Sequence, residues 1–548
     1  MAAYISNILT DIPTRFRGPG GAVAVLQDGK LLGQQCWGYA DLKQRIPMTA
    51  DTMMPICSIS KQMLCGLLTD LERNPTPAMV AQADEPSKQF QDQLDQLLHP
   101  GLFEERGWKL TMKHLCNNQS GLRDYWALTV CWGANPEDPF SIAEHGPQVL
   151  DRLRSFHFEP GTQYSYANTN FFIIARVIEK VTGEELGKLL EERIFKPAGM
   201  KTAKLCADTA QHPPPVVGYE GDEETGFIPA VNRIEWAGDA GIVASLEDMI
   251  AYEQFIDRSA MDTESWYATN SEQQKFTSGA PSAYGYGLSR QLVDGVLTVR
   301  HGGALRGFRL SRCYAPVSRV SIVVLLNNDR MEPGEISDYL LKRVLSKQEY
   351  KDNPEDAIEI SPRWVKTWLD SKTALAVHVS EPKRGEILLK YFSKPVKMRA
   401  ISANSALGDG MTATLQSNDT IHAQITKDNW VIDARWAGKP KPLSQSPELL
   451  GLYHCPSIES VVHITGSRGA LYAMFDGFLG EGPVHMMRPI GTDLWALACP
   501  RAMDHAPPGD WTVSVRRDNG GKVLGLTISG WLARILEYFK DGEQPPDA

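Results

Sequence analysis

The chain has 548 residues, of which 42% are hydrophobic, and it carries a formal net charge of −10. It is too long for one ordinary core, and typical domain sizes suggest about three to four units. Charges of one sign form no long run and no apolar run is long enough to span a bilayer, so we expect a soluble globular protein that binds neither nucleic acid nor a membrane.

The amino terminus and the cysteines indicate a cytoplasmic protein. Residues 1–8 lack the basic segment and the continuous apolar stretch of a secretory signal. The nine cysteines, an odd number, are scattered through apolar segments, which is typical of reduced core thiols. The alternative for Cys57 is a reactive thiol, although a small buried hydrophobic side chain explains it as well.

In chain order, the sequence opens with a hairpin, continues with helical segments between Ser58 and Met200, and then returns to strands. The expected strands are residues 21–26, 31–38, 286–288, 297–301 and 320–326. Strands at both ends with helices between them predict one antiparallel sheet flanked by helices, an α+β fold. His301 would then lie at a strand edge that faces the helix starting at Ser58.

After Val344 the sequence changes to short alternating strands with Gly, Pro and Asn turns and no long helical pattern. Residues 348–356 are polar and contain a proline, which is typical of a linker, and residues 438–442 mark a second break. The expected domains are residues 1–345, 355–440 and 447–548.

The two halves of this tail resemble each other. Val-His-Val at 377–379 and Val-His-Ile at 462–464 are each followed, a few residues later, by Arg-Gly and then by a leucine. A one-residue difference in the hairpin between them is easily absorbed. Because closing a sheet removes its exposed edges, we expect two related small β-barrels.

Ser58 and Lys61 are the first candidates for catalytic chemistry. Residues three apart on a helix share one face, so the Lys61 amine can meet the Ser58 hydroxyl, which needs a nearby base to act as a nucleophile. The apolar residues 62–68 predict a buried helix, which would lower the pKa of Lys61 toward that of a usable base. The structural alternatives are an N-cap serine and a surface lysine. A second Ser-x-x-Lys at 380–383 contains Pro382 and is expected to be a solvated hairpin.

Two further motifs follow in order. Ser-x-x-Lys at 58–61, Tyr-x-Asn at 166–168 and His-Gly-Gly at 301–303 together resemble the serine β-lactamase and penicillin-binding-protein superfamily, in which the third motif is more often Lys-Thr-Gly. This resemblance covers nearly the whole chain and implies one catalytic domain with two antiparallel barrels. Residues 110–122, 160–163 and 238–242 resemble the class C-like members, and residues 55–58, 116–127, 301–307 and 531–534 resemble the D-stereospecific aminopeptidases.

The resemblance implies a role for each motif residue. Ser58 is the nucleophile and Lys61 is its proton acceptor. Tyr166 shares the role of base and passes a proton to the leaving amine, and Asn168 holds Lys61 and the substrate amide. The backbone N–H groups of Ser58 and Ala304 form the oxyanion hole. The structural alternatives are an aromatic residue in a strand-like turn for Tyr166 and a turn asparagine for Asn168.

In the third motif a histidine replaces the usual lysine. His301 can donate a hydrogen bond to Tyr166 or to the substrate without a fixed positive charge, which weakens the expectation that the site binds a carboxylate. Gly302 and Gly303 let the substrate backbone lie close to the strand.

Residues 500–510 connect two expected strands, and the plain interpretation is an exposed loop. Resemblance to the D-aminopeptidases implies that this loop of the last barrel reaches the catalytic cleft and governs specificity. Asp504 would pair with the α-ammonium of an aminopeptidase substrate, because a carboxylate in a water-poor cleft is its natural partner. Arg501 and Met503 are the other expected specificity residues.

The expected function is that of a D-stereospecific aminopeptidase, which removes small N-terminal D-residues such as D-Ala from peptides and amides through an acyl-enzyme. Two alternatives stay open: an esterase or D,D-peptidase on the same serine, and a non-catalytic penicillin-binding protein. Cys-x-x-Cys, His-Glu-x-x-His and Walker-type motifs are absent from the sequence, so we expect no metal and no organic cofactor. A homodimer is expected as well.

Overall fold

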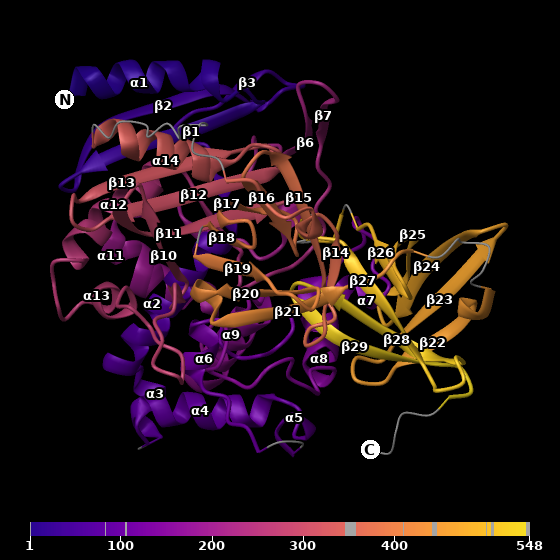
Figure 1. The fold of residues 1–548 in the computed structure, drawn as a ribbon. Coiled ribbons are helices and arrows are strands. Elements are labelled where there is room, and N and C mark those ends of the chain that lie inside the picture. Colours follow the sequence, from indigo (N-terminus) through magenta and orange to yellow (C-terminus); the bar gives the residue numbers. More distant parts are fainter. Residues whose placement is uncertain are drawn as a thin grey trace.

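The computed structural model describes residues 2–82, 84–104, 107–345, 358–408, 410–440, 447–499, 501–505 and 509–543. Figure 1 shows an α+β unit and the two barrels that follow it in the chain. The expected linker at 348–356 lies outside the described residues, as do Pro500, Ala506 and Pro507 of the expected specificity loop. Within the described part, no helix is long and apolar enough to cross a membrane.

An eight-stranded antiparallel sheet forms the centre of the α+β unit, which confirms the expected fold class. The first strand, β1, pairs with β2 on one side and with β13 on the other, so the opening hairpin joins strands from the far end of the unit. In spatial order the strands are β3 (Ile46–Pro47), β2 (Lys30–Asp41), β1 (Gly20–Gln27), β13 (Val320–Leu326), β12 (Phe308–Ala315), β11 (Val296–Leu305), β10 (Leu288–Val293) and β9 (Tyr284–Gly285).

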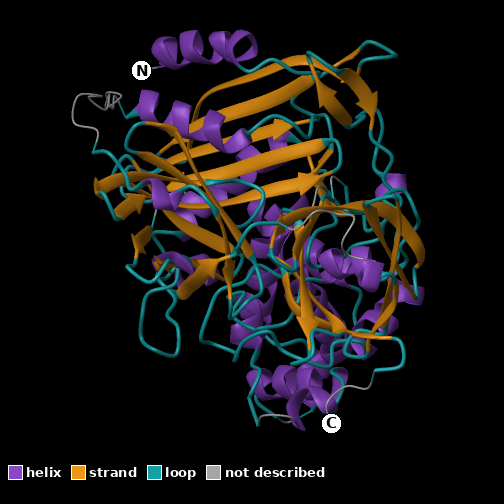
Figure 2. Cartoon of the chain, turned by 45° about the vertical axis from the view of Figure 1, so that its right-hand side comes forward, coloured by secondary structure: helices purple, strands orange, loops and turns teal. Residues whose placement is uncertain are grey.

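Helices cover both faces of this sheet (Figure 2). Successive side chains of a strand point to opposite faces, so one strand can pack against helices on each side. Val23 and Val25 of β1 pack in one apolar cluster with α1 and α14, whereas Ala22 and Ala24 pack in the larger cluster on the other face. The longer helices are α1 (Ala2–Arg15), α2 (Ser60–Arg73), α4 (Pro86–Leu97), α8 (Ile142–Asp151), α9 (Asn168–Thr182), α12 (Leu246–Ser259) and α14 (Pro333–Val344).

Short elements complete the unit. The strands β4 (Met54–Pro55), β8 (Ile242–Ala244) and β5 (Lys204–Leu205) form a small sheet, of which β4 comes shortly before α2 in the chain. The strands β6 (Tyr219–Asp222) and β7 (Gly226–Pro229) form a hairpin. The short helical segments are η1 (Cys57–Ile59), α3 (Pro77–Ala81), α5 (Gly101–Glu104), α6 (Met112–Cys116), α7 (Tyr125–Cys131), α10 (Leu186–Leu190), the π-helical η2 (Glu191–Phe195), α11 (Lys196–Ala198), η3 (Thr209–Gln211) and α13 (Trp266–Asn270).

Two closed eight-stranded antiparallel barrels follow, which confirms the interpretation of the alternating tail. Val377 lies in β15 and Val462 in β23, each the second strand of its barrel, so the repeated sequence pattern corresponds to a repeated structure. The second Ser-x-x-Lys lies at the end of β15 in the hairpin to β16, as expected.

The barrel strands alternate buried and outward-facing residues along most of their length. The first barrel contains β14 (Thr367–Asp370), β15 (Ala376–Lys383), β16 (Glu386–Lys390), β17 (Val396–Ser402), β18 (Ser405–Gly408), β19 (Met411–Leu415), β20 (Thr420–Ile425) and β21 (Trp430–Trp436), with η5 (Pro362–Trp364) before it and η6 (Thr426–Asp428) within it. The second contains β22 (Gly451–Cys455), β23 (Ser460–Ser467), β24 (Ala470–Gly477), β25 (Gly480–Gly491), β26 (Leu494–Leu497), β27 (Trp511–Arg517), β28 (Val523–Gly530) and β29 (Ala533–Lys540), preceded by η8 (Pro447–Leu449).

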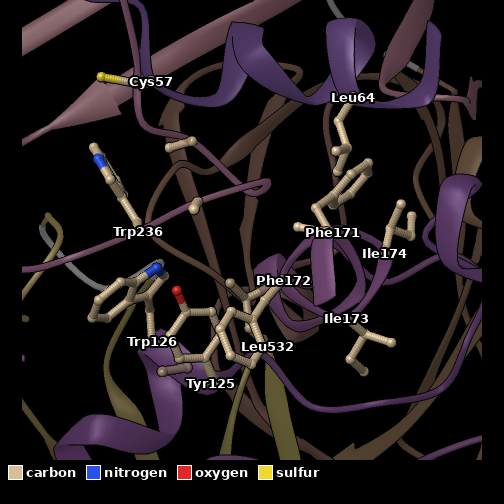
Figure 3. Packing of buried hydrophobic residues seen from close by; sticks show 14 of the residues in the cluster. Cys57, Leu64, Tyr125, Trp126, Phe171, Phe172, Ile173, Ile174, Trp236 and Leu532 are labelled. Carbon is tan, nitrogen blue, oxygen red and sulfur yellow. The ribbon is translucent and has the colours of Figure 1, made fainter. Parts of the chain in front are cut away.

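The second barrel shares a hydrophobic core with the α+β unit, whereas the first barrel has a core of its own. The indole N–H of Trp132 donates to the Ile458 carbonyl at 2.8 Å, and the Asp124 N–H donates to the Leu532 carbonyl at 3.0 Å. Leu532 lies beside Tyr125 in the packed interior (Figure 3). The second barrel is therefore held against α7, the helix that begins next to the candidate site.

Candidate active site

Ser58 lies on a strained turn that leads into α2. Cys57, the preceding residue, has a φ of +51°, a conformation that residues with a side chain rarely adopt. Ile59 occupies the N-cap position of α2 and no side chain caps the helix, so Ser58 is not an N-cap serine. Burial raises the pKa of the Cys57 thiol well above its usual value, which argues against the alternative of a reactive thiol.

Lys61 is fully buried, with its amine beside the Ser58 hydroxyl. Its Nζ lies 2.8 Å from Ser58 Oγ, 2.8 Å from Asn168 Oδ1 and 2.5 Å from the carbonyl oxygen of Asp239. The two amide oxygens can only accept, so they bind two N–H groups, and the lone pair of the neutral amine then points at Ser58. Burial lowers the pKa of Lys61 to about 8, against the charges of Asp239 and Asp124, which raise it. Near neutral pH a fraction of Lys61 is thus a free amine that can accept the Ser58 proton.

Tyr166 contacts the same hydroxyl. Its OH donates to Ser58 Oγ at 2.9 Å, and Lys61 Nζ lies 5.0 Å from the centre of its ring. Burial raises the pKa of Tyr166 well above its usual value, so the phenol stays protonated. Tyr166 can therefore relay a proton between Ser58 and a leaving amine, whereas Lys61 is the better initial base. Tyr164 packs against Tyr284 instead, with ring centres 5.4 Å apart.

Asn168 is the first residue of α9, and Asp124 fixes its position. One carboxylate oxygen of Asp124 accepts the Asn168 backbone N–H at 2.6 Å, while the other caps α7 by accepting the Ala127 N–H at 3.1 Å. Asp124 thereby joins two helix N-termini, whose dipoles favour a negative charge. Its pKa is nevertheless raised to about 7 by burial and by the nearby Asp504. Sequence reasoning missed this role, although an aspartate just before an apolar segment is a typical N-cap signal.

Asp239 holds Lys61 through its backbone carbonyl, and its side chain anchors that carbonyl. One carboxylate oxygen accepts the hydroxyl of Tyr125 at 2.9 Å and the indole N–H of Trp126 at 3.0 Å. Figure 3 shows these two rings side by side below Trp236, a residue that lines the active-site cavity. The segments that contain Asp239 and Tyr125 were both noticed in the sequence, but their mutual contact was not expected.

His301 differs from its expected role. Its Nδ1 lies 2.6 Å from the Gly302 carbonyl oxygen, which only accepts, so Nδ1 carries the proton and Nε2 accepts from the Tyr284 hydroxyl at 3.0 Å. Burial and the nearby Lys61 lower the pKa of His301 to about 3, so the ring is neutral. The expected hydrogen bond to Tyr166 is not formed among the described residues, where the two ring centres lie 6.3 Å apart. Tyr284 is the partner that sequence reasoning missed.

The residues after His301 run along a free strand edge. The ladder between β10 and β11 ends at the pair Ser289–Arg300, so β10 does not extend beside Gly302, Gly303 and Ala304. A Cβ on Gly303 would lie 2.6 Å from the Ile56 carbonyl oxygen, so only glycine lets this strand approach the turn before Ser58. This approach brings the backbone of Ala304 and that of Ser58 to the same cavity, as an oxyanion hole requires.

One cavity of about 570 Å³ contains most of the expected site residues. Asp504 lines it although it comes from the second barrel, and its backbone carbonyl accepts the Arg306 N–H at 2.8 Å. Asp504 is 6% exposed, and burial raises the pKa of its carboxyl to about 7. The described residues that line the cavity are Ser58, Tyr166, Asn168, Trp236, Gln291, Arg300–Ser311 in part, Glu332, Pro333, Gly334, Glu335, Asp338, Lys394, Asp504 and His505.

Arg501 and Met503 lie elsewhere than expected. Neither is among the described residues that line this cavity. Arg501 pairs with Glu220 at 2.8 Å, and Met503 is buried in the large core. The charge of Arg501 and the apolar surface of Met503 are thus already used within the fold, whereas Asp504 and His505 are the described loop residues that line the cavity. In the described part of the chain, no three His, Cys, Asp or Glu side chains are grouped as metal ligands.

Comparisons with known proteins agree with this geometry. The β-lactamase family model matches residues 5–346, and the model of D-aminopeptidase domain B matches residues 357–539. The octameric penicillin-binding protein homologue from Pyrococcus abyssi has a similar fold, with a TM-score of 0.53 and 18% identity over 79% of this chain and 98% of that one. The structure of SurE aligns over 98% of this chain and 99% of its own, with a TM-score of 0.52 and 15% identity. Fold and motifs thus define a member of the serine β-lactamase and penicillin-binding-protein superfamily.

Two curated relatives show which family of this superfamily the chain belongs to. The D-aminopeptidase of Brucella anthropi is 39% identical over 528 residues, which cover 96% of each chain. The D-aminopeptidase of Cereibacter sphaeroides is 39% identical over 539 residues, 98% of each chain. The chain belongs to the D-aminopeptidase family, which confirms the resemblance inferred from its motifs.

Proposed function

We propose that this protein is a D-stereospecific aminopeptidase that releases small N-terminal D-residues, such as D-Ala, from peptides and amino acid amides. The observation that carries the proposal is the buried carboxylate of Asp504 in the same cavity as Ser58. A serine hydrolase needs only the nucleophile, its base and an oxyanion hole. A carboxylate beside them is the feature that an N-terminal ammonium requires.

The acylation step follows from the arrangement around Ser58. The Lys61 amine removes the Ser58 proton as Oγ attacks the substrate carbonyl carbon, and the N–H groups of Ser58 and Ala304 stabilise the oxyanion. When the tetrahedral intermediate collapses, a proton passes through the Tyr166 hydroxyl to the leaving nitrogen, and the amine departs. Asn168 keeps the Lys61 amine in place throughout, because its side-chain oxygen accepts from Nζ.

Deacylation reverses these roles. A water molecule attacks the ester carbonyl of the acyl-enzyme, the neutral Lys61 amine accepts its proton directly or through the Tyr166 hydroxyl, and Ser58 regains that proton as the D-amino acid leaves. The neutral His301 fits this substrate class, because a second cation near Lys61 would repel the substrate ammonium and attract a carboxylate.

The test is a comparison of three anilides. D-Alanine p-nitroanilide should be hydrolysed, whereas its L-isomer and its N-acetyl form should be poor substrates. Equal turnover of the free and acetylated forms would favour an esterase or D,D-peptidase, and a stable acyl-adduct without turnover would favour a penicillin-binding protein.

The organisation of the protein is part of the proposal. We propose domains at 1–345, 355–440 and 447–548, with the second barrel contributing Asp504 to the site. A cytoplasmic location is supported by nine cysteines that form no disulfide. The proposed homodimer can be tested by light scattering after size-exclusion chromatography, where a monomer mass would contradict it.

A further inference from the structure

Two glycines in the active-site cavity are not explained by the fold. Among the glycines of the described residues, three combine an ordinary backbone conformation with no atom within 3.4 Å of the place that a Cβ would take: Gly187, Gly302 and Gly334. Two of these three line the cavity that contains Ser58. By contrast, Gly303 has the Ile56 carbonyl 2.6 Å from that place. A Cβ at Gly302 or Gly334 would make only ordinary van der Waals contact, at 3.6 Å from the Leu310 carbonyl oxygen and from Arg300 Nη2 respectively. The fold therefore does not require glycine at these positions, and glycine widens the cavity there.

The two glycines lie along one part of the cavity, which we call the outer channel. It is lined by Arg300, Gly302, Ser311, Gly334 and Asp338. Arg300 and Gly302 are two residues apart on β11 and so face the same side, and Ser311 is the β12 partner of Gly302. A Cβ on Gly334, near the start of α14, would lie 3.6 Å from Arg300 Nη2. The outer channel therefore continues from Gly302 past Arg300 to the start of α14.

Polar groups of the outer channel are held in place within the fold. Arg300 pairs with Asp338 at 2.6 Å, and Ser337 donates to Ser311 Oγ at 3.1 Å. Lys394, from the first barrel, pairs with Glu332 at 2.6 Å, and both residues also line the cavity. The outer channel is thus a charged, preorganised surface, which suits a solvated peptide better than an apolar group.

The expected orientation of the bound substrate places its leaving group in the outer channel. The backbone of Asp504 is tied to Arg306, just beyond the Leu305 end of β11, whereas Gly302 lies toward the opposite end of this free edge. If Asp504 binds the ammonium, the single acyl residue occupies the Leu305 end. Everything after the scissile bond must then extend past Gly302.

We propose that the outer channel binds the peptide residues that follow the scissile bond, so that the preferred substrates are peptides with two or more residues after the D-residue rather than amides of one D-amino acid. This inference rests on the proposed aminopeptidase function. Contacts with a remote part of the substrate raise kcat/KM when they strengthen in the transition state. A leaving peptide would gain such contacts, whereas ammonia from an amide would gain none.

The experiment compares D-alaninamide with D-Ala-Gly-Gly-Gly in wild type, Gly334→Trp and the matched control Gly334→Ala. Wild type should show a kcat/KM about tenfold or more higher for the tetrapeptide. Gly334→Trp should remove this preference while keeping D-alaninamide hydrolysis within about twofold, because a Cβ at this position lies beside Arg300 Nη2 in the outer channel. Gly334→Ala should behave as wild type and melt slightly higher, since alanine favours a helix over glycine.

Each result is informative. Equal kcat/KM for the amide and the tetrapeptide in wild type would overturn the proposal that the outer channel binds the leaving peptide. So would an equal loss of activity toward both substrates in a folded Gly334→Trp. If the wild type hydrolyses neither substrate, the proposed function is refuted instead. If Gly334→Trp does not fold, inhibition of the wild type is measured instead. Triglycine should inhibit D-alaninamide hydrolysis more strongly than glycinamide does. Equal inhibition by the two compounds would overturn the inference.

Discussion

Replacing Asp504 by asparagine tests whether its negative charge binds the substrate ammonium, as the proposed aminopeptidase function requires. The substitution keeps the shape of the side chain and removes only its negative charge. Burial raises the pKa of Asp504 to about 7, so at pH 8 the wild-type side chain is largely ionised and can pair with an ammonium. We expect Asp504→Asn to lose activity toward substrates with a free amino group and to keep activity toward substrates without one.

The expected size follows from the burial of Asp504, which is 6% exposed. A hydrogen bond to a charged group contributes about 1.5–3 kcal/mol. Since about 1.36 kcal/mol is a factor of ten in rate, kcat/KM for D-alanine p-nitroanilide should fall about 13- to 160-fold. N-acetyl-D-alanine p-nitroanilide should be unaffected or improved, because its neutral amide avoids a buried charge.

The control is Asp510→Asn, the same chemical change at the last residue of the loop 500–510. Asp510 pairs with Arg488 at 2.9 Å and does not line the cavity in the described part of the chain. Both substrates should retain wild-type kcat/KM in this control. Equal losses on both substrates in Asp504→Asn would mean that Asp504 only supports the fold, and the reasoning about its charge would fail.

Three further predictions concern the catalytic group. Ser58→Ala and Lys61→Ala should each abolish turnover in a folded protein, because residues that act as one unit are not additive; substantial activity in a folded Ser58→Ala would rule out the acyl-enzyme. For the acetylated anilide, kcat/KM should rise with pH around the Lys61 pKa of about 8, since protonation at lower pH removes the base; a flat profile from pH 6 to 9 would contradict this assignment. His301→Lys should raise the ratio of penicillin acylation to D-alaninamide hydrolysis, most strongly at low pH, where the new amine is charged; an unchanged ratio would show that His301 does not discriminate.

Much of the fold could be predicted because its signals are local. The apolar run that became β13 and the alternating strands after Val344 each carry their own pattern, and the repeat between residues 377 and 462 indicates two similar units. Which barrel shares its core with the α+β unit was not predictable. That depends on contacts such as Trp132 with Ile458, which join residues more than 300 positions apart.

The candidate site was predictable where spacing or motif order carries chemistry. Ser58 and Lys61 are one helical turn apart, and the structure brings their reactive atoms to 2.8 Å. Tyr284 was missed because it lies on β9, two strands away from His301 on β11, and because the contact depends on which imidazole nitrogen carries the proton. Asp239 lies in residues 238–242, a segment that the family resemblance singled out. Its backbone carbonyl, rather than its side chain, binds Lys61, and no sequence pattern reveals a carbonyl ligand.

The buried charges around Lys61 explain why a distant barrel belongs to this site. Burial alone would lower the pKa of Lys61 further, and the negative charges of Asp239, Asp124 and Asp504 raise it again to about 8. Burial raises the pKa of Asp124 and that of Asp504 to about 7 each, so these carboxylates keep part of their protons near neutral pH. A bound substrate ammonium would favour the ionised form of Asp504, and an ionised Asp504 raises the pKa of Lys61 and so increases the protonated fraction of that amine. If Asp504 pairs with the substrate ammonium, as proposed, one carboxylate links substrate binding to catalysis, because its charge also acts on the pKa of the base.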